Sequence, residues 1–116
     1  MTNLERGDVV LVLFPNSDLQ AFKHRPVLVV QATNLNTGLP QFVGAMITSN
    51  LARRGHPSRV FIPLRSPVSQ AAGLRTDSII MTDNLATIFD AAVVQKLGKL
   101  PDLSEVDKAL RITLGF

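Results

Sequence analysis

The sequence predicts a mainly β fold with minor α content, in which a small, strongly curved antiparallel barrel is followed by one amphipathic helix. Short apolar segments rich in β-branched residues recur between residues 8 and 82, and turn-forming residues separate them. The last segment instead places apolar residues at helical spacing. Strands do not alternate with long helices, so a doubly wound parallel sheet is disfavoured.

Five segments are expected to form strands, each bounded by glycine, proline, asparagine or serine. In the second of them we expect Pro26 at the start of the strand, because proline cannot donate to a sheet ladder. The five ranges are Asp8–Phe14, Arg25–Gln31, Phe42–Thr48, Arg59–Leu64 and Ser78–Thr82.

The segments after the fourth and fifth strands are less regular. A loop is expected from the fourth strand through Gly73. The range Thr87–Val94 is ambiguous, and we interpret it as a helical turn that leads into a strand or extended piece near Val94–Lys99.

A helix is expected at the C-terminal end. Asp102 and Glu105 stand three residues apart, the spacing of a capping box that satisfies free backbone donors at a helix start. Gly115 is expected to end the helix. The predicted apolar stripe consists of Leu103, Val106, Leu110 and Leu114.

Length and composition indicate a single domain over residues 1–116. A chain of 116 residues with 46% apolar residues can bury a core without cross-links. The longest apolar runs, Val9–Phe14 and Pro26–Val30, are far shorter than the roughly 20 residues of a membrane span. No export leader is recognised, and no cysteine is present for disulfides or thiolate metal sites. We therefore expect a cytoplasmic protein without membrane association.

The net charge of +3 is unevenly distributed along the chain. Residues 1–75 hold eight Lys or Arg against three acids, a net charge of +5, whereas residues 76–116 have a net charge of −2. The basic excess lies around loops between the early strands, which favours contact with a polyanion such as nucleic acid. A solvated surface that only aids solubility is the alternative.

The segment Lys23-His24-Arg25 directly precedes a run of branched apolar residues. Arg25 is therefore expected at the end of a rigid strand. Its planar guanidinium group can bind a phosphate or a carboxylate through two parallel hydrogen bonds. An ordinary surface arginine is the alternative interpretation.

Three loops are expected to converge on one face of the barrel. They carry cations, hydroxyl groups and imidazoles, but the two histidines lack metal-ligand spacing, so we expect neither a metal nor a cofactor. Such groups suffice for cleavage of RNA by its own 2′-hydroxyl group, because the substrate supplies the nucleophile. The candidates are Asn16, Ser17, Lys23, His24 and Arg25 in the first loop, Thr48, Ser49, Asn50, Arg53, Arg54 and His56 in the second, and Arg75, Thr76 and Asp77 in the third.

Four ordered segments resemble the MazF/PemK family of toxin endoribonucleases, the mRNA interferases of type II toxin–antitoxin systems. The similarity extends into the C-terminal segment from Val106 and covers nearly the whole chain. The resemblance implies an SH3-like barrel, a homodimer, metal-independent cleavage of single-stranded mRNA, and neutralisation by an antitoxin. It also implies that the protein contacts operator DNA only indirectly, through the antitoxin. The four segments are Arg6–Val12, Arg25–Gln31, Ile47–Asn50 and Leu74–Ile80.

The resemblance also implies roles for individual residues. Arg25 would bind the scissile phosphate and donate a proton to the leaving oxygen, although an arginine pKa above about 12 makes charge stabilisation its larger role. Thr48 would hydrogen-bond the phosphate or the nucleophilic hydroxyl group. His24, His56 and Asp83 are candidates for the general base. The residues expected to bind RNA are Asn16, Ser17, Lys23, His24, Ser49, Asn50, Arg53, Arg54, His56 and Arg75.

The chain departs from the family pattern at two positions. Ala86 stands where the family commonly has an arginine before Thr-Ile-Asp, and Met81 stands where some relatives have a catalytic arginine. The alternative function is therefore a barrel that acts by binding, either like the gyrase-poisoning toxins or as an inactive relative within an antitoxin and operator complex.

Overall fold

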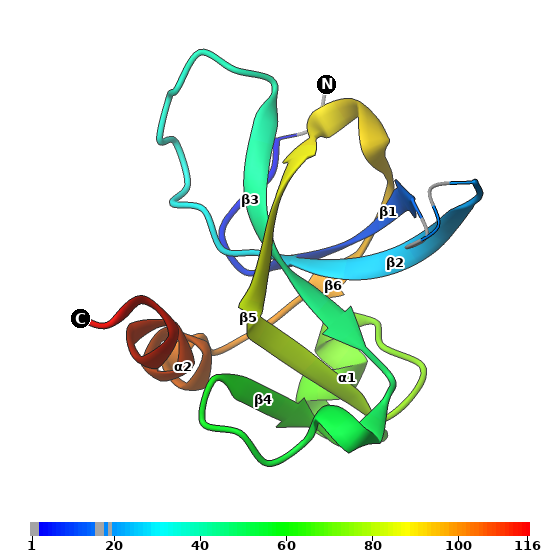
Figure 1. The fold of residues 1–116 in the computed structure, drawn as a ribbon, viewed down its shortest axis with the longest axis vertical. Coiled ribbons are helices and arrows are strands. Elements are labelled where there is room, and N and C mark those ends of the chain that lie inside the picture. The colour runs from blue at the N-terminus through cyan, green and yellow to red at the C-terminus, as the bar shows by residue number, and fades with distance from the viewer. Residues whose placement is uncertain (1–2, 16–17, 19) are drawn as a thin grey trace.

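The computed structural model describes residues 3–15, 18 and 20–116, which form one curved sheet with helices at its lower side (Figure 1). The mainly β fold with a C-terminal helix is confirmed. The elements are β1 (Asp8–Pro15), β2 (Phe22–Val29), β3 (Gln41–Thr48), the 3-10 helix η1 (Leu51–Arg53), β4 (Arg59–Ile62), α1 (Pro67–Ala72), β5 (Ser78–Phe89), the 3-10 helix η2 (Asp90–Ala92), β6 (Val93–Lys99) and α2 (Ser104–Leu114).

The sheet contains six strands in the order β4-β5-β3-β2-β1-β6, and every neighbouring pair is antiparallel. Within the part of the chain that the structure describes, β4 and β6 pair on one side only. The sheet therefore curls strongly without closing into a complete barrel (Figure 1).

Strand β5 is longer than the sequence indicated, because it continues through a local break. The register passes from Ala45 opposite Leu85 directly to Met46 opposite Met81, so residues 82–84 leave the ladder with β3. The expected end of the strand at Thr82 falls at this break, but β5 resumes and runs to Phe89. The helical turn expected within Thr87–Val94 is present as η2, and the strand expected near Val94–Lys99 is β6, but β5 continues to Phe89 before the turn begins. Only the three residues of η2 turn helically before β6 begins.

The apolar parts of strands β1, β2 and β3 are buried on both faces, whereas the first three residues of β2 are exposed. Alternate residues of each strand belong to two core clusters, as Val9 and Val10 of β1 illustrate. The first cluster, which includes Val9, packs against α1 and α2 through Ala72 and Val106. The second, which includes Val10, lies on the other face of these strands together with Phe42 of β3. Burial on both faces explains why these strands appear as continuous apolar runs in the sequence.

Helix α1 occupies part of the segment that was expected to be a loop. The Ser66 hydroxyl group caps it by accepting from the Ser69 backbone N–H at 3.1 Å, and Pro67 occupies the first helical position. Gly73 ends the helix with φ +71°. The cap, the proline and the final glycine were readable as signals, but a helix of six residues is too short to show apolar periodicity.

Helix α2 begins and ends almost where expected, but the capping box is absent. Leu103 occupies the cap position without a side-chain hydrogen bond. Asp102 instead accepts a hydrogen bond from the Ser104 backbone N–H at 2.9 Å, and this bond lowers the pKa of the Asp102 carboxyl group. Gly115 ends the helix with φ +81°, as predicted. Leu114, expected in the apolar stripe, is exposed, and Ala109 is buried with Val106 instead.

Strand β2 begins three residues earlier than predicted, so Pro26 lies inside the strand rather than at its start. Pro26 pairs with Leu11 of β1, but β3 pairs only with Val27–Val29 of β2. A proline is tolerated at this position because its strand has a neighbour on one side only there.

Candidate functional site

A cleft opens where β2 and β3 separate. The last registered pair between them joins Val27 to Met46. Beyond this pair, the first half of β2 stays beside β1, while the end of β3 stays beside β5. The divergence leaves a cleft of about 660 Å³ between the β1–β2 hairpin and the lower part of the molecule.

The cleft brings together residues from all three loops that the sequence analysis singled out. They come from β2, from the end of β3 and its following turn, and from the segment after α1. The predicted residues among them are Lys23, His24, Arg25, Thr48, Ser49, Asn50, Arg75 and Thr76. Asn16 and Ser17, also predicted to bind RNA, lie outside the described residues.

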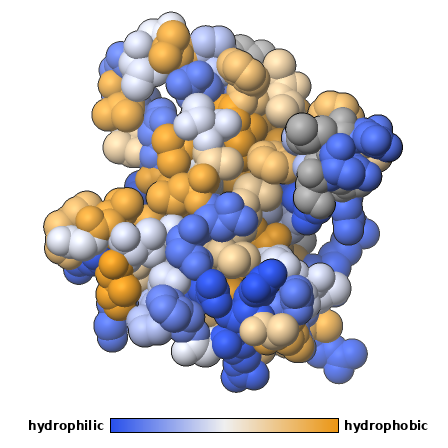
Figure 2. All heavy atoms as spheres, in the orientation of Figure 1, coloured by the Kyte–Doolittle hydropathy of each residue, from blue (hydrophilic) through white to orange (hydrophobic). Residues whose placement is uncertain are grey.

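The charged side chains around the cleft are all cationic. Lys23, Arg25 and Arg75 line it, and among the described lining residues there is neither aspartate nor glutamate. Figure 2 shows hydrophilic residues both at the tip of the β1–β2 hairpin and over the lower part of the same view. A concave surface lined by one sign of charge attracts ligands of the opposite sign, here anions.

Thr48 is held by a local turn that leaves its hydroxyl proton available. Its Oγ1 accepts a hydrogen bond from the Asn50 backbone N–H at 3.1 Å. The Asn50 side chain in turn accepts from the Ala52 backbone N–H at 3.1 Å and caps η1. Because a hydroxyl group can accept and donate at once, Thr48 can still donate a hydrogen bond to an anion in the cleft.

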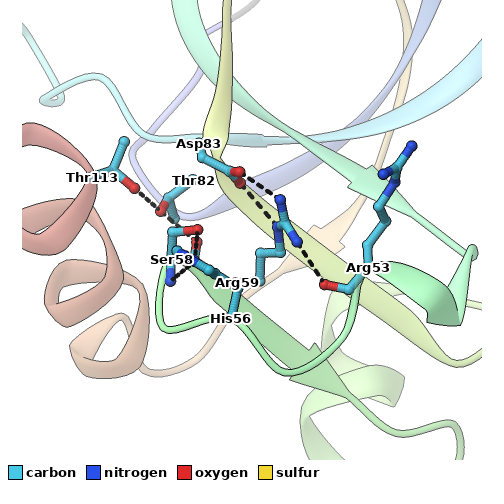
Figure 3. A network of polar contacts seen from close by, with 7 residues as sticks. All are labelled: Arg53, His56, Ser58, Arg59, Thr82, Asp83 and Thr113. Carbon is cyan, nitrogen blue, oxygen red and sulfur yellow. Dashed lines mark hydrogen bonds and ion pairs between the residues drawn. The ribbon is translucent and has the colours of Figure 1, made fainter.

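Four other candidates lie in or beside a polar network away from the cleft (Figure 3). They are Arg53, Arg54, His56 and Asp83. Arg59 donates to the Asp83 carboxylate at 2.8 and 3.3 Å and to the Arg53 carbonyl oxygen at 3.1 Å. The hydrogen bonds from Arg59 lower the pKa of Asp83. Arg54 stacks its guanidinium group 3.9 Å from the centre of the Phe61 ring.

His56 belongs to the same network and has a structural task. Its Nδ1 accepts from the Ser58 backbone N–H at 3.1 Å and lies 2.7 Å from the Ser58 hydroxyl oxygen. The Ser58 carbonyl oxygen accepts from the Thr82 hydroxyl group at 2.6 Å, and Thr82 Oγ1 lies 2.9 Å from Thr113 Oγ1 of α2. The network therefore ties the turn before β4 to the break in β5 and to the C-terminal helix.

Asp77 and the two departures from the family pattern also lie outside the cleft. Asp77 accepts from the Leu64 backbone N–H at 2.7 Å. Ala86 pairs with Gly44 and packs against the second core cluster, and Met81 pairs with Met46 and Arg59.

Several cleft residues were not expected from the sequence. Leu11, Pro26, Ile47 and Leu97 provide apolar surface, and Gln95 of β6 adds an amide group. The sequence did not place Leu11 or Gln95 beside Pro26, because strand alternation does not show which strands pair, and the segment of Gln95 was not assigned firmly to a strand.

Nowhere in residues 3–15, 18 and 20–116 do three or more His, Cys, Asp or Glu side chains gather as a metal site would require. No helix in this part of the chain is long and apolar enough to cross a membrane.

Comparisons with known proteins agree with one another. A family model described as PemK-like, MazF-like toxin of type II toxin–antitoxin system matches residues 5–114. Endoribonuclease MazF2 of Mycobacterium bovis is 33% identical over 105 residues, which cover 88% of this chain and 88% of that protein. Endoribonuclease MazF6 of Mycobacterium tuberculosis has the same identity and the same coverage of both chains.

Solved structures have the same fold. An endoribonuclease from Mycobacterial species aligns with a TM-score of 0.73 at 23% identity, covering 100% of this chain and 95% of that one. A chain of the MazE–MazF complex from Deinococcus radiodurans aligns with a TM-score of 0.75 at 19% identity, covering 99% of each chain.

Proposed function

The chain belongs to the PemK-like, MazF-like toxin family of type II toxin–antitoxin systems, and from that premise we propose that it is a toxin endoribonuclease that cleaves single-stranded mRNA in the cleft between β2 and β3. The curated relatives at 33% identity are endoribonucleases. The described residues that line the cleft include cations and no carboxylate, which supports an RNA substrate.

The relation between Arg25 and Thr48 carries the proposal. Each lies two residues beyond the pair Val27–Met46 on its own strand, so the two occupy opposing positions on the same face of the sheet. Both line the cleft and both are partly buried. A rigid guanidinium group and a hydroxyl donor on opposite sides of one opening are suited to hold a phosphate between them.

The proposed reaction uses the substrate's own nucleophile. The 2′-oxygen attacks the adjacent phosphorus, the bond from phosphorus to the 5′-oxygen breaks, and a 2′,3′-cyclic phosphate forms. Arg25 stabilises the charge that develops on the phosphoryl oxygens and assists protonation of the 5′-oxygen, while Thr48 donates a hydrogen bond to the phosphate. The reaction needs no redox change and no covalent enzyme intermediate.

His24 is our proposed general base for the 2′-hydroxyl proton. Of the three candidates, His24 lines the cleft, whereas the His56 ring is engaged with Ser58 and the Asp83 carboxylate is engaged with Arg59. The exposed His24 imidazole lines the cleft and can accept a proton without breaking a hydrogen bond to another described residue.

The other residues that we propose to bind RNA fall into two groups, those that line the cleft and those that lie outside it. Lys23, Ser49, Asn50 and Arg75 line the cleft beside the proposed reacting groups. Arg53, Arg54 and His56 lie next to it in the chain but face the turn before β4, so we assign them to RNA beyond the cleft.

The test is cleavage of a long single-stranded RNA by the purified protein in EDTA. We expect discrete fragments that end in 2′,3′-cyclic phosphate and begin with a 5′-hydroxyl group. Arg25→Ala protein prepared in parallel controls for contaminating nuclease. Cleavage that requires added magnesium would contradict the mechanism. A complete lack of cleavage would favour the alternative of a barrel that acts only by binding.

We further propose that the protein acts in the cytoplasm as a homodimer and is neutralised by a cognate antitoxin. One structurally similar chain is a mycobacterial endoribonuclease in complex with its cognate antitoxin. The +5 charge of residues 1–75 suits an acidic, flexible antitoxin segment that covers the cleft and competes with RNA. A titration with the product of the adjacent gene tests competition. Tight binding without loss of RNA affinity or cleavage would exclude occlusion of the cleft.

A further inference from the structure

The cleft extends beneath the β1–β2 hairpin as far as β6. Leu11 of β1 pairs with Pro26 on one side and with Gln95 on the other, so the three residues form one row across three strands. Directly paired residues project from the same face of a sheet, and all three line the cleft. The row therefore forms a continuous wall that is apolar at its centre and carries an amide at its β6 end.

The opposite wall is formed by the segment after α1. Gly73 presents no side chain there, and Thr76 adds a hydroxyl group near the exposed Arg75. Leu97 of β6 also lines the cleft and packs, partly buried, against the first core cluster. This part of the cleft thus combines apolar side chains with a few polar groups, the composition of a small-molecule subsite.

The subsite adjoins the proposed phosphate position along a free strand edge. β3 does not pair with β2 before Val27, so the edge of β2 at Arg25 and Pro26 is open. These adjacent residues project to opposite faces of the sheet. A nucleotide that lies along this edge can place its phosphate at Arg25 and its base against Pro26 and Leu11.

We propose that the wall formed by Leu11, Pro26 and Gln95 binds one nucleobase of the RNA and that Gln95 determines the preference for that base. The inference rests on the proposed ribonuclease function. Gln95 is exposed, and among the described residues its side chain is not engaged in a hydrogen bond. Single-stranded RNA is read through the edges of unstacked bases.

Adenine is the expected base. A glutamine amide donates and accepts at once, and adenine offers the matching pair of an N7 acceptor and an N6 donor. On the same edge, guanine presents two acceptors and no donor, so the amide oxygen would have no partner there.

The test uses inorganic phosphate and the four nucleoside 5′-monophosphates as probes, with binding followed by NMR titration. We expect AMP to bind more tightly than GMP, CMP and UMP. Gln95→Ala should weaken AMP about 5-fold or more, to the level of the other nucleotides, without changing phosphate binding. The matched control is Gln70→Ala, because Gln70 is exposed on α1 and does not line the cleft.

Two outcomes would overturn the base subsite: equal binding of all four nucleotides, or a loss in Gln95→Ala that is the same for AMP and for inorganic phosphate. RNA cleavage by the wild type is measured separately. A base preference that depends on Gln95 in a protein that does not cleave RNA would refute the ribonuclease function and retain the subsite. Cleavage with base preferences that Gln95→Ala leaves unchanged would refute the subsite alone.

Discussion

Gly98 of β6 and Ala71 of α1 meet backbone to backbone. A β-carbon placed on Gly98 would lie 2.2 Å from the Ala71 carbonyl oxygen and 2.7 Å from the carbonyl carbon of Ala72. The contact is reciprocal, because a β-carbon on Gly73 would lie 2.2 Å from the Leu97 carbonyl oxygen. Two glycines therefore allow α1 to approach β6 closely, and both Gly73 and Leu97 line the cleft.

Gly98→Ala is expected to destabilise the protein by about 1–3 kcal/mol, the usual cost of forcing extra volume into a packed site. The backbone atoms in the contact cannot move aside as a flexible side chain would. Urea unfolding measures the change. Gly38→Asn is the control, since Gly38 has open space around it and asparagine tolerates its φ of +79°. Equal unfolding midpoints for Gly98→Ala and the wild type would show that α1 is not fixed by this contact.

Arg25→Ala is expected to lower the single-turnover rate of RNA cleavage by at least about 10²-fold, the scale for removal of one donor to the transition state. Thr48→Ala should cost less, because a hydroxyl group is a neutral donor, and Thr48→Ser should retain most of the rate. Arg111→Ala, on the exposed side of α2, is the matched control. Wild-type rates in Arg25→Ala would show that the phosphate is held elsewhere.

His24→Gln is expected to reduce the cleavage rate at saturating RNA by about 10²-fold or more, because removal of a positioned general base has effects of that size. His56→Gln is the internal comparison. It should leave the rate near that of the wild type and lower thermal stability instead, since Nδ1 of His56 accepts from Ser58. The reverse pattern would transfer the role of base to His56.

Binding of a non-cleavable RNA should weaken with salt, with a log–log slope of roughly −0.7 for each phosphate neutralised. Replacing both Arg53 and Arg54 by alanine should make the slope less steep, if these residues extend the RNA path beyond the cleft. Lys108→Ala, on α2, should leave the slope unchanged. A double variant with the wild-type slope would place Arg53 and Arg54 on a solvated turn without contact to RNA.

Asp83→Asn should destabilise the protein near neutral pH, and the difference from the wild type should shrink below about pH 4. The reason is that Arg59 lowers the pKa of Asp83 in the folded state. A lowered carboxyl pKa contributes stability above the unfolded-state pKa of about 3.9, and that contribution disappears as the pH falls through the folded-state pKa. Urea midpoints at several pH values test this, and Arg59→Ala should remove the same pH dependence. A difference that stays constant with pH would contradict an ionic contribution.

The sequence by itself determined the fold class and the two catalytic positions that we propose. Runs of β-branched residues bounded by turn residues identified the cores of the first five strands, because strand propensity and turn chemistry act over a few neighbouring residues. Gly115 ended the last helix as predicted for the same reason. The change from apolar to polar sequence placed Arg25 and Thr48 among the candidates at strand ends, and the resemblance to the MazF/PemK family assigned them the catalytic roles.

Only the tertiary structure decided which candidates share one cleft. Arg53, Arg54 and His56 follow Asn50 closely in the chain, yet the hydrogen bonds of Arg59 and Ser58 turn this segment toward β5. Gln95 enters the cleft because β6 pairs with β1, at a sequence separation of more than 80 residues. The hydrophobic pattern of a strand indicates which of its faces is buried. Which distant strand pairs with it, and which strand lies at a sheet edge, is decided only when the chain folds.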